Sequence, residues 1–293
     1  MRIGGGGRSS NLEDRRGERP RGFGIGGGGR GIGLGAILFA AFMAIVFKAD
    51  FFSMLGLGSA VSNRAPQVQT SPGPAQGVND AAEEPMVLFV SGVLDDAQAF
   101  WAKTLPATMG APYRDAKLVL FRDLNTSACG RAEAAMGPFY CPLDEKVYID
   151  LGFYDELARR FQAPGDFAQA YVLAHEIGHH VQTILGTSEQ VQRLQQQRPQ
   201  LANQASVRLE LQADCYAGAW GHSAAQRGLL EAGDVEEGLR AATAIGDDNI
   251  QRQTQGRVAP ESFTHGSSEQ RLAWFRRGLE SGDPRQCDTF AGR

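Results

Sequence analysis

The stretch that decides the fold is AYVLAHEIGHHVQTIL, residues 170–185, which reads as a helix and contains the pattern H-E-x-x-H at residues 175–179. On a helix, His175 and His179 are one turn apart and point in the same direction, and Glu176 lies about 100° round from His175. Two imidazoles can then hold one zinc ion while the carboxylate takes a proton from a water bound to it, whose pKa zinc lowers to about 7. The alternative is a surface helix with two solvated histidines.

A second stretch, LELQADCYAGAW at residues 209–220, offers the rest of a metal site. A catalytic zinc takes three protein ligands and keeps one position open for water. Glu210 and Asp214 are four residues apart and share one face of the predicted helix, beside its apolar stripe, where unpaired carboxylates are costly. We therefore expect Glu210 to be the third ligand and Asp214 to orient a ligand histidine, which we take to be His175. Two solvated acids on an exposed edge are the alternative.

The three remaining histidines receive different interpretations. His180 points about 100° away from the histidine before it, so it cannot share the metal and is expected to be polar lining or a hydrogen-bonded core residue. His222 is expected to be structural. His265 lies in a loop before the last predicted helix, from which it could reach the site and stabilise a developing oxyanion, so we take it as a candidate catalytic residue. Tyr140 and Tyr148 are alternatives for this role.

The region before the folded domain divides into three segments. Residues 1–30 hold seven arginines and three acidic residues among many glycines, so we expect a disordered basic segment. Residues 31–50 begin with an uncharged run, GIGLGAILFAAFMAIVF, that predicts a single transmembrane helix, with a buried core helix as the alternative. Residues 51–84 are expected to be a flexible linker, and residues 85–293 the folded domain.

Charge and cysteine usage predict a location. Arginines before the apolar run place the N-terminus in the cytoplasm and the later residues in the periplasm or outside a bacterial cell, anchored in the inner membrane. A net charge of −4 gives no basic excess for a nucleic-acid partner. Four cysteines in an exported domain predict two disulfide bonds, with four free thiols in a cytoplasmic domain as the alternative. Cys129 and Cys141 bracket a short loop, so we pair them, and Cys215 with Cys287.

The remaining patterns predict an α+β domain that is mainly helical. Strands are expected at residues 117–121, 139–141 and 146–150, which is enough for a small mixed sheet only. Helices are expected where apolar residues recur at helical spacing. They cover residues 93–108, 152–161, 166–185, 188–222 with an interruption at Pro199, 234–253 and 267–282.

Five stretches resemble those of the bacterial membrane-anchored neutral zinc metallopeptidase family. They are RSSNLEDRR (8–16), GPFYCPLDEKVYIDLGFYDEL (137–157), GDFAQAYVLAHEIGHHVQ (165–182), LELQADCYAGAW (209–220) and FTHGSSEQRLAWFRRGLESGDPRQCDTF (263–290). The resemblance implies a zincin fold in which the glutamate of an E-x-x-x-D pattern, here Glu210 before Asp214, completes the metal site. It also implies a strand beside the site that could hold an extended substrate, for which residues 146–150 are our candidate.

Together these features predict a membrane-anchored zinc endopeptidase with a peptide or protein substrate. Zinc held by His175, His179 and Glu210 polarises the scissile carbonyl, and Glu176 passes a proton from water to the leaving amine. Two alternatives stay open. One is a zinc hydrolase of another amide, such as cell-wall peptide cross-links, and the other is a non-catalytic scaffold whose zinc is structural.

Overall fold

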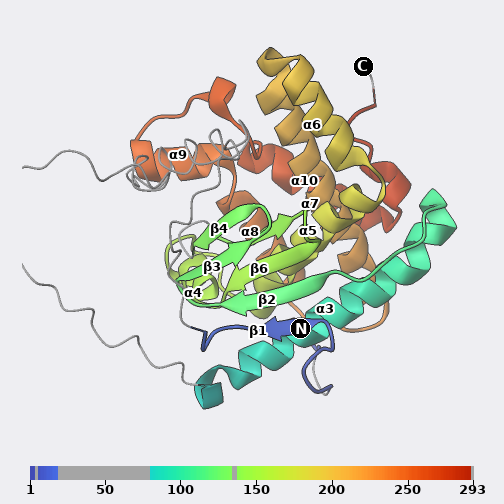
Figure 1. Cartoon of the computed structure of the whole chain (residues 1–293), viewed down its shortest axis with the longest axis vertical. Helices are drawn as coiled ribbons and strands as arrows, with labels where there is room; N and C mark the ends of the chain where they lie inside the picture. Colours follow the sequence, from blue (N-terminus) through green and yellow to red (C-terminus); the bar gives the residue numbers. More distant parts are fainter. Residues whose placement is uncertain (4–5, 19–79, 134–136, 292–293) are drawn as a thin grey trace, which may run out of the picture.

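Helix α5 (Asp166–Ile184) carries the H-E-x-x-H pattern through the middle of the molecule (Figure 1). In this computed structural model, which describes residues 1–3, 6–18, 80–133 and 137–291, most side chains of α5 are buried. Gly165 (φ 125°) precedes the helix and Gly186 (φ 73°) follows it. These positive φ values favour glycine, so the two glycines set where the helix begins and ends.

A small mixed sheet packs against the helices. Its strand order is β1 (Leu12–Asp14), β2 (Lys117–Phe121), β6 (Lys146–Asp150) and β5 (Phe139–Cys141). Strands β1 and β6 are both parallel to β2, whereas β5 is antiparallel to β6. The prediction of three strands is confirmed, with the same bounds for β2, β5 and β6. Strand β1 was not predicted.

The two faces of the sheet pack against different layers, because alternate residues of a strand point to opposite sides. The two leucines of β2 join the main core with the helices, whereas Val119 and Phe121 join a second cluster on the other face. A hairpin of β3 (Leu124–Ser127) and β4 (Gly130–Glu133), which was not predicted, contributes Ala132 to that cluster. The sheet is therefore covered on both faces, which explains the continuous apolar run of β2.

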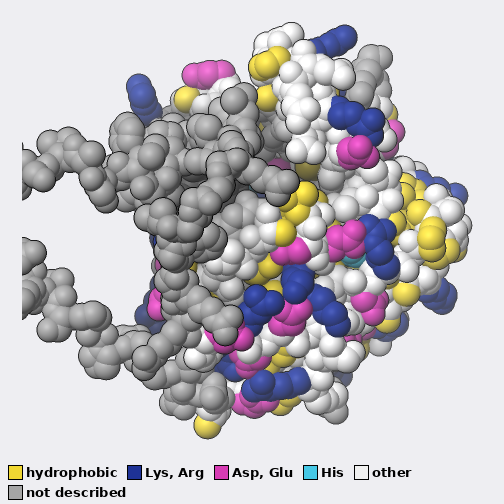
Figure 2. Space-filling model, in the orientation of Figure 1, with side chains coloured by type: hydrophobic (Ala, Val, Ile, Leu, Met, Phe, Trp, Pro, Cys, Tyr) yellow, Lys and Arg dark blue, Asp and Glu magenta, His cyan; other side chains and the backbone are white. Residues whose placement is uncertain are grey.

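For residues 6–18, the structure corrects the prediction that residues 1–30 are disordered, whereas residues 19–30 lie outside the described residues. Within residues 6–18, β1 pairs with β2, and neighbouring arginines bind carboxylates at the start of the next helix. Arg8 Nε donates to Glu84 at 3.0 Å, and the buried Arg16 reaches Glu83 at 2.5 Å. Figure 2 shows acidic and basic side chains interspersed on this face of the molecule. The composition predicted a solvated basic tail because composition does not register pairing between residues distant in sequence.

This pairing bears on the predicted membrane topology. Two strands that hydrogen-bond in one sheet lie on the same side of any membrane. A cytoplasmic N-terminus with an external domain would need β1 to leave this sheet, and the predicted location stays a prediction. The predicted transmembrane helix at residues 31–50 lies outside the described residues, as does the predicted linker up to residue 79. Within the ranges that the structure does describe, no helix has both the length and the apolar character needed to cross a bilayer.

Helices make up the rest of the domain, with two differences from the prediction. Helix α3 (Asp80–Met109), which crosses behind β1 and β2 in Figure 1, starts before the predicted domain boundary at residue 85. The single helix expected at residues 234–253 is divided at Gly246 into α8 (Asp234–Ala244) and α9 (Asp247–Gln255). The other helical elements are α4 (Gly152–Arg159), α6 (Thr187–Gln197), η2 (Pro199–Leu201), α7 (Ala202–Gln226), η3 (Pro260–Ser262), α10 (Ser268–Ser281) and η4 (Pro284–Cys287).

Three glycines bring the central helices unusually close together. A Cβ on Gly218 of α7 would lie 2.2 Å from Phe275 O of α10, and a Cβ on Gly278 of α10 would lie 1.9 Å from Cys215 O of α7. A Cβ on Gly178 of α5 would lie 3.0 Å from the backbone oxygen of Ala213 on α7. Helices α5 and α10 therefore both press against α7, which carries Glu210.

The predicted disulfide pairing is confirmed. Cys129 bonds Cys141, which joins the β3–β4 hairpin to strand β5. Cys215 bonds Cys287, which attaches the C-terminal segment to α7. No cysteine of the described residues is free. The described residues thus form an α+β domain with a mainly helical core and a small mixed sheet.

Candidate metal centre

Three side chains from α5 and α7 converge on one point. His175 and His179, one turn apart on α5, bring their Nε2 atoms to 3.2 Å from each other. Glu210 of α7 places Oε2 3.2 Å from His175 Nε2 and Oε1 3.5 Å from His179 Nε2. The three residues could hold a metal ion, because one ligand atom from each lies within 4.8 Å of the others. The structure therefore brings together the three residues that the sequence singled out as ligands.

The separations between these atoms fit a tetrahedral zinc site. Ligand atoms about 2.0–2.1 Å from a tetrahedral ion lie about 3.3–3.4 Å from each other. The closest contacts within the cluster are 3.2, 3.2 and 3.5 Å. Two imidazole lone pairs and a carboxylate that face each other repel unless a cation lies between them. A set of two histidines and one glutamate also leaves the fourth position for water.

Hydrogen bonds to the far side of each ring fix both histidines. His175 Nδ1 lies 2.8 Å from Asp214 Oδ1, and His179 Nδ1 lies 2.8 Å from Gln182 Oε1. Because both oxygens accept, each Nδ1 carries a proton and each Nε2 faces the cluster, where it offers a lone pair to a metal ion when the ring is neutral. Asp214 was predicted in this role. Gln182 was missed, although its position three residues after His179 on the same helix is a signal that could have identified it.

A buried arginine holds Asp214 in place. Arg271 of α10 donates from Nε to Asp214 Oδ2 and from Nη2 to Oδ1, both at 2.9 Å, and Tyr171 donates its hydroxyl to Oδ1 at 2.6 Å. Burial raises the pKa of Asp214, but Arg271 and His175 outweigh this effect and hold that pKa below its usual value. Asp214 is therefore an ionised acceptor for His175. Arg271 and Tyr171 were not predicted.

The electrostatic state of the cluster favours a bound cation. Burial lowers the pKa of His175, but the charge and hydrogen bond of Asp214, together with Glu210, outweigh burial and raise it to about 9. Burial raises the pKa of Glu210, but attraction to His179 and hydrogen bonds from both histidines hold it well below its usual value. An ionised carboxylate beside two histidines attracts a proton or a metal ion to the same place.

Glu176 lies on the same turn of α5 and is buried. Burial is the main cause that raises its pKa, partly opposed by His175 and His179. A carboxylate with a raised pKa next to a metal centre suits proton transfer, because its proton affinity is closer to that of its partners at neutral pH. The hydroxyl of Tyr154, a buried residue whose charge state is coupled to Glu176, has no hydrogen-bond partner among the described residues.

His265 lies in a loop that packs against α7 beside Glu210. The next residue, Gly266 (φ 91°), approaches the side chains of Val207 and Leu211, which flank Glu210 in sequence. Burial lowers the pKa of His265, but its hydrogen bond with Asp247 and the charge of Glu210 outweigh burial and raise it. The structure therefore places this predicted catalytic residue near the metal cluster.

The other histidines have structural partners, as predicted. His180 lies between the hydroxyl of Tyr140, 3.0 Å from Nδ1, and the backbone oxygen of Arg114, 2.7 Å from Nε2. His222 Nδ1 donates to Leu279 O at 2.7 Å. The contact between His180 and Tyr140 also attaches strand β5 to α5, directly after the second ligand histidine. Tyr148 is bonded to Asp144 instead, away from the cluster.

The predicted substrate strand is wrong. Residues 146–150 form β6, which pairs with β2 on one side and β5 on the other, so neither of its edges is open. In the sheet of the described residues, β5 is the edge strand on the side of α5. The prediction failed because the sequence shows where a strand is but not which strands flank it.

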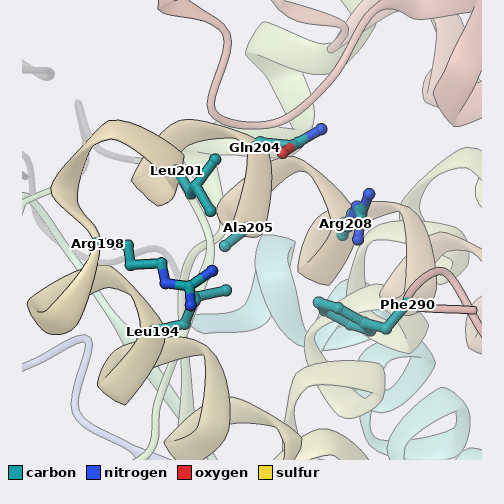
Figure 3. A pocket seen from close by; sticks show the side chains of 7 residues that line it. All are labelled: Leu194, Arg198, Leu201, Gln204, Ala205, Arg208 and Phe290. Atoms are coloured by element: carbon teal, nitrogen blue, oxygen red, sulfur yellow. The ribbon is translucent and has the colours of Figure 1, made fainter. Parts of the chain in front are cut away.

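The pocket shown in Figure 3 is lined by residues other than those of the donor cluster. It measures about 250 Å³ and lies between α6, η2, α7 and the C-terminal segment. None of the cluster residues lines it. Its lining residues are Leu194, Arg198, Leu201, Gln204, Ala205, Arg208 and Phe290. This pocket is therefore separate from the donor cluster.

Comparison with known proteins agrees with the donor cluster. Residues 1–290 match the family described as "Putative neutral zinc metallopeptidase". The chain belongs to this family. It is 45% identical over 293 residues to the uncharacterized protein YpfJ of Escherichia coli K12, with 99% of each chain covered. It is 42% identical over 208 residues to the uncharacterized protein Rv2575 of Mycobacterium tuberculosis H37Rv, covering 67% of this chain and 68% of the relative. No solved structure matches the chain.

Proposed function

We propose that this protein is a zinc-dependent endopeptidase. The observation that carries the proposal is the convergence of His175 Nε2, His179 Nε2 and the Glu210 carboxylate. The two nitrogens lie 3.2 Å apart, and Glu210 places Oε2 3.2 Å from the first and Oε1 3.5 Å from the second. The hydrogen bonds of Asp214 and Gln182 support it, because they present the correct ring nitrogen of each histidine to the cluster. The family description supports the same activity.

When bound, zinc supplies Lewis-acid activation of a water and of the scissile carbonyl. Glu176 accepts one proton of that water at its carboxylate as the oxygen attacks the carbonyl carbon. The same carboxylate then gives the proton to the leaving nitrogen, so that the amide and water become a carboxylic acid and an amine. His265 donates a hydrogen bond to the oxygen on which negative charge develops.

The substrate is proposed to bind as an extended peptide along β5. Phe139–Cys141 is the edge strand of the sheet, and an edge strand offers backbone N–H and C=O groups to an added strand. The bond from Tyr140 to His180 supports this placement, because it holds the strand beside the helix that carries both ligand histidines. An extended peptide added there runs past the donor cluster.

We propose that the domain works in an oxidising compartment outside the cytoplasm. The two disulfide bonds support this location, because such bonds persist where thiols are not kept reduced. Attachment to the membrane through residues 31–50 stays a prediction. A peptide or protein substrate, with no nucleic-acid partner, likewise stays a prediction.

Metal analysis and a peptide-library assay of the purified full chain test the proposed function. We expect one zinc per chain and cleavage of internal peptide bonds, lost in Glu176→Gln, which keeps the shape of the side chain. Glu189→Gln on α6, whose side chain is 67% exposed, is the matched control and should keep full activity. Substoichiometric zinc, or a Glu176→Gln variant as fast as wild type, would overturn the proposal. Parallel incubation with casein and with peptidoglycan separates a protease from a cell-wall amidase.

A further inference from the structure

Asp247, the first residue of α9, gathers one loop around its carboxylate. Its Oδ2 accepts the backbone N–H groups of Thr264, His265 and Gly266 at 2.7, 2.7 and 3.1 Å. Its own N–H donates to Gly266 O at 2.9 Å. The carboxylate is buried, at 3% exposure, and within the described residues it meets no lysine or arginine. Backbone N–H groups and one histidine therefore replace water around this charge.

The second oxygen of Asp247 contacts the ring of His265. Oδ1 lies 3.2 Å from His265 Nδ1, and the hydroxyl of Thr264 lies 3.1 Å from the same nitrogen. A carboxylate only accepts, so Nδ1 carries the proton that faces Asp247. The opposite edge of the ring, with Nε2, consequently points away from the loop. The ring is also partly open, with the side chain 33% exposed.

The loop is attached at the position where a group could act on a substrate at the metal cluster. Gly266 approaches Val207 Cγ1 and Leu211 Cδ2, so that an added Cβ would lie 3.3 and 3.2 Å from them. These residues stand one turn before and one residue after Glu210 on α7.

We propose that Asp247 is the positioning residue of His265: it sets the ring so that Nε2 faces the substrate carbonyl at the metal cluster. The inference rests on the proposed peptidase function and adds a role to a residue that the sequence did not single out. The two oxygens of the Asp247 carboxylate then have different tasks. Oδ2 shapes the loop, whereas Oδ1 accepts the Nδ1 proton and so favours the ring form that is protonated on both nitrogens, in which Nε2 can donate to the substrate oxygen.

The variant Asp247→Asn separates the proposed positioning role of Asp247 from a purely structural role in holding the loop. Asparagine retains one oxygen, which can still accept the backbone N–H groups, but presents an amide N–H₂ where Oδ1 faced His265. The loop is then retained while the partner of Nδ1 changes from acceptor to donor. Asp247→Ala removes both tasks and serves only as a measure of the loop's contribution to folding.

Asp248→Asn is the matched control. Asp248 follows on the same turn of α9 and ties a neighbouring segment in a similar way, since its Oδ1 accepts both the N–H and the hydroxyl of Ser268 at 2.7 Å. Equal loss of stability in the two asparagine variants, with unequal loss of activity, isolates the effect of the His265 contact.

The experiment measures peptide cleavage, zinc affinity and histidine NMR on the full-length zinc-loaded chain. We expect His265→Ala to lower kcat about 100-fold, the cost of one oxyanion donor. Asp247→Asn should lower kcat about tenfold or more with KM and zinc affinity within about threefold, and Asp248→Asn should match wild type. In a His265→Ala background, Asp247→Asn should add almost nothing. Two-bond ¹H–¹⁵N spectra should show His265 protonated on both ring nitrogens in wild type and on only one in Asp247→Asn.

Each failure points to a different error. An Asp247→Asn variant as active as Asp248→Asn, or one whose His265 ring stays protonated on both nitrogens, overturns the positioning role while the peptidase function stands. Additive losses in the double variant show that Asp247 acts elsewhere and also overturn it. A His265→Ala variant with full activity overturns the role of His265 itself. Loss of the proposed function altogether appears separately, as a Glu176→Gln variant that cleaves like wild type.

Discussion

Gly178, between the glutamate and the second histidine of the motif, controls the distance between α5 and α7. A Cβ at this position would lie 3.0 Å from Ala213 O and 3.1 Å from Ala213 Cα, both backbone atoms of α7. Contacts below 3.4 Å are tighter than ordinary, so Gly178→Ala requires α7 to retreat by a few tenths of an ångström. Ala213 lies on the same helix turn as Glu210. The retreat therefore moves the Glu210 carboxylate away from both histidines.

The expected magnitudes follow from two opposing effects. Alanine is favoured over glycine in a helix interior by about 1 kcal/mol. Overpacking against a neighbouring element costs about 1–3 kcal/mol, so the metal-free variant should lose about 0–2 kcal/mol of stability. The effect on metal binding is larger, because contacts of 3.2–3.5 Å already match the separations that a tetrahedral ion requires. We expect zinc affinity to fall about tenfold, within the range caused by misplaced ligand support.

Competition with a fluorescent zinc chelator measures this affinity, and urea unfolding of the metal-free chain measures the stability. Gly221→Ala on α7 is the control, because its Cβ would meet only the ends of side chains, Leu279 Cδ1 at 3.1 Å and Phe167 Cζ at 3.3 Å. It should bind zinc like wild type. A Gly178→Ala variant that is more stable than wild type and binds zinc equally well would refute the reasoning.

Three further predictions concern the surroundings of the cluster. Arg271→Met leaves the Asp214 charge buried without its partner, so the free energy of unfolding measured in urea should fall by about 3–5 kcal/mol. Adding Asp214→Asn should recover much of this loss, and additive losses in the double variant would contradict the prediction. Replacing Cys215 and Cys287, which are 72 residues apart, should lower stability by about 4 kcal/mol, because the longer loop restricts the unfolded chain more. Replacing Cys129 and Cys141, which are 12 residues apart, should lower stability by about 3 kcal/mol. A lower melting temperature for the second variant than for the first would argue against this order. In the metal-free chain, the pKa of His175 is raised to about 9. Protonated His175 therefore stabilises the fold fully below its unfolded pKa of about 6.5, and this contribution is lost as the pH rises through about 9. The contribution to the free energy of unfolding is at most about 3 kcal/mol. His175→Gln should lack this slope in urea unfolding, and a wild-type chain without the slope would count against the assignment.

The parts of the site that the sequence predicts are those whose geometry is local. His175 and His179 are one turn apart on any helix, and so are Glu210 and Asp214, so helical periodicity alone aligns each pair. The strands are predictable for a similar reason, because short apolar runs between turn residues have few other conformations. The contact between α5 and α7 at Gly178 joins residues distant in sequence, so periodicity does not predict it. A glycine inside a predicted helix is nevertheless consistent with close approach of another backbone.

The parts that the sequence did not predict depend on contacts between distant residues. Arg271 lies 57 residues after Asp214, and Asp247 lies 18 residues before His265. Nothing in the pattern around either residue distinguishes it from a solvated charge. The substrate strand was assigned to β6 for the same reason, since an edge is a property of the assembled sheet. Long-range pairing also explains why residues 12–14 were not recognised as a strand within a segment rich in glycine and arginine.

The pairing of β1 with β2 makes a firm prediction about topology. Because both strands belong to one sheet, we expect residue 7 and residue 143 to lie on the same side of any membrane that anchors the chain. Gly7 has open space around an added Cβ, and Leu143 is 74% exposed, so both accept a single added cysteine. In spheroplasts of an expressing bacterium, a membrane-impermeant maleimide should label Gly7→Cys and Leu143→Cys alike, because a bilayer cannot separate hydrogen-bonded strands. Labelling of Leu143→Cys without Gly7→Cys would show that β1 is not in this sheet in the cell.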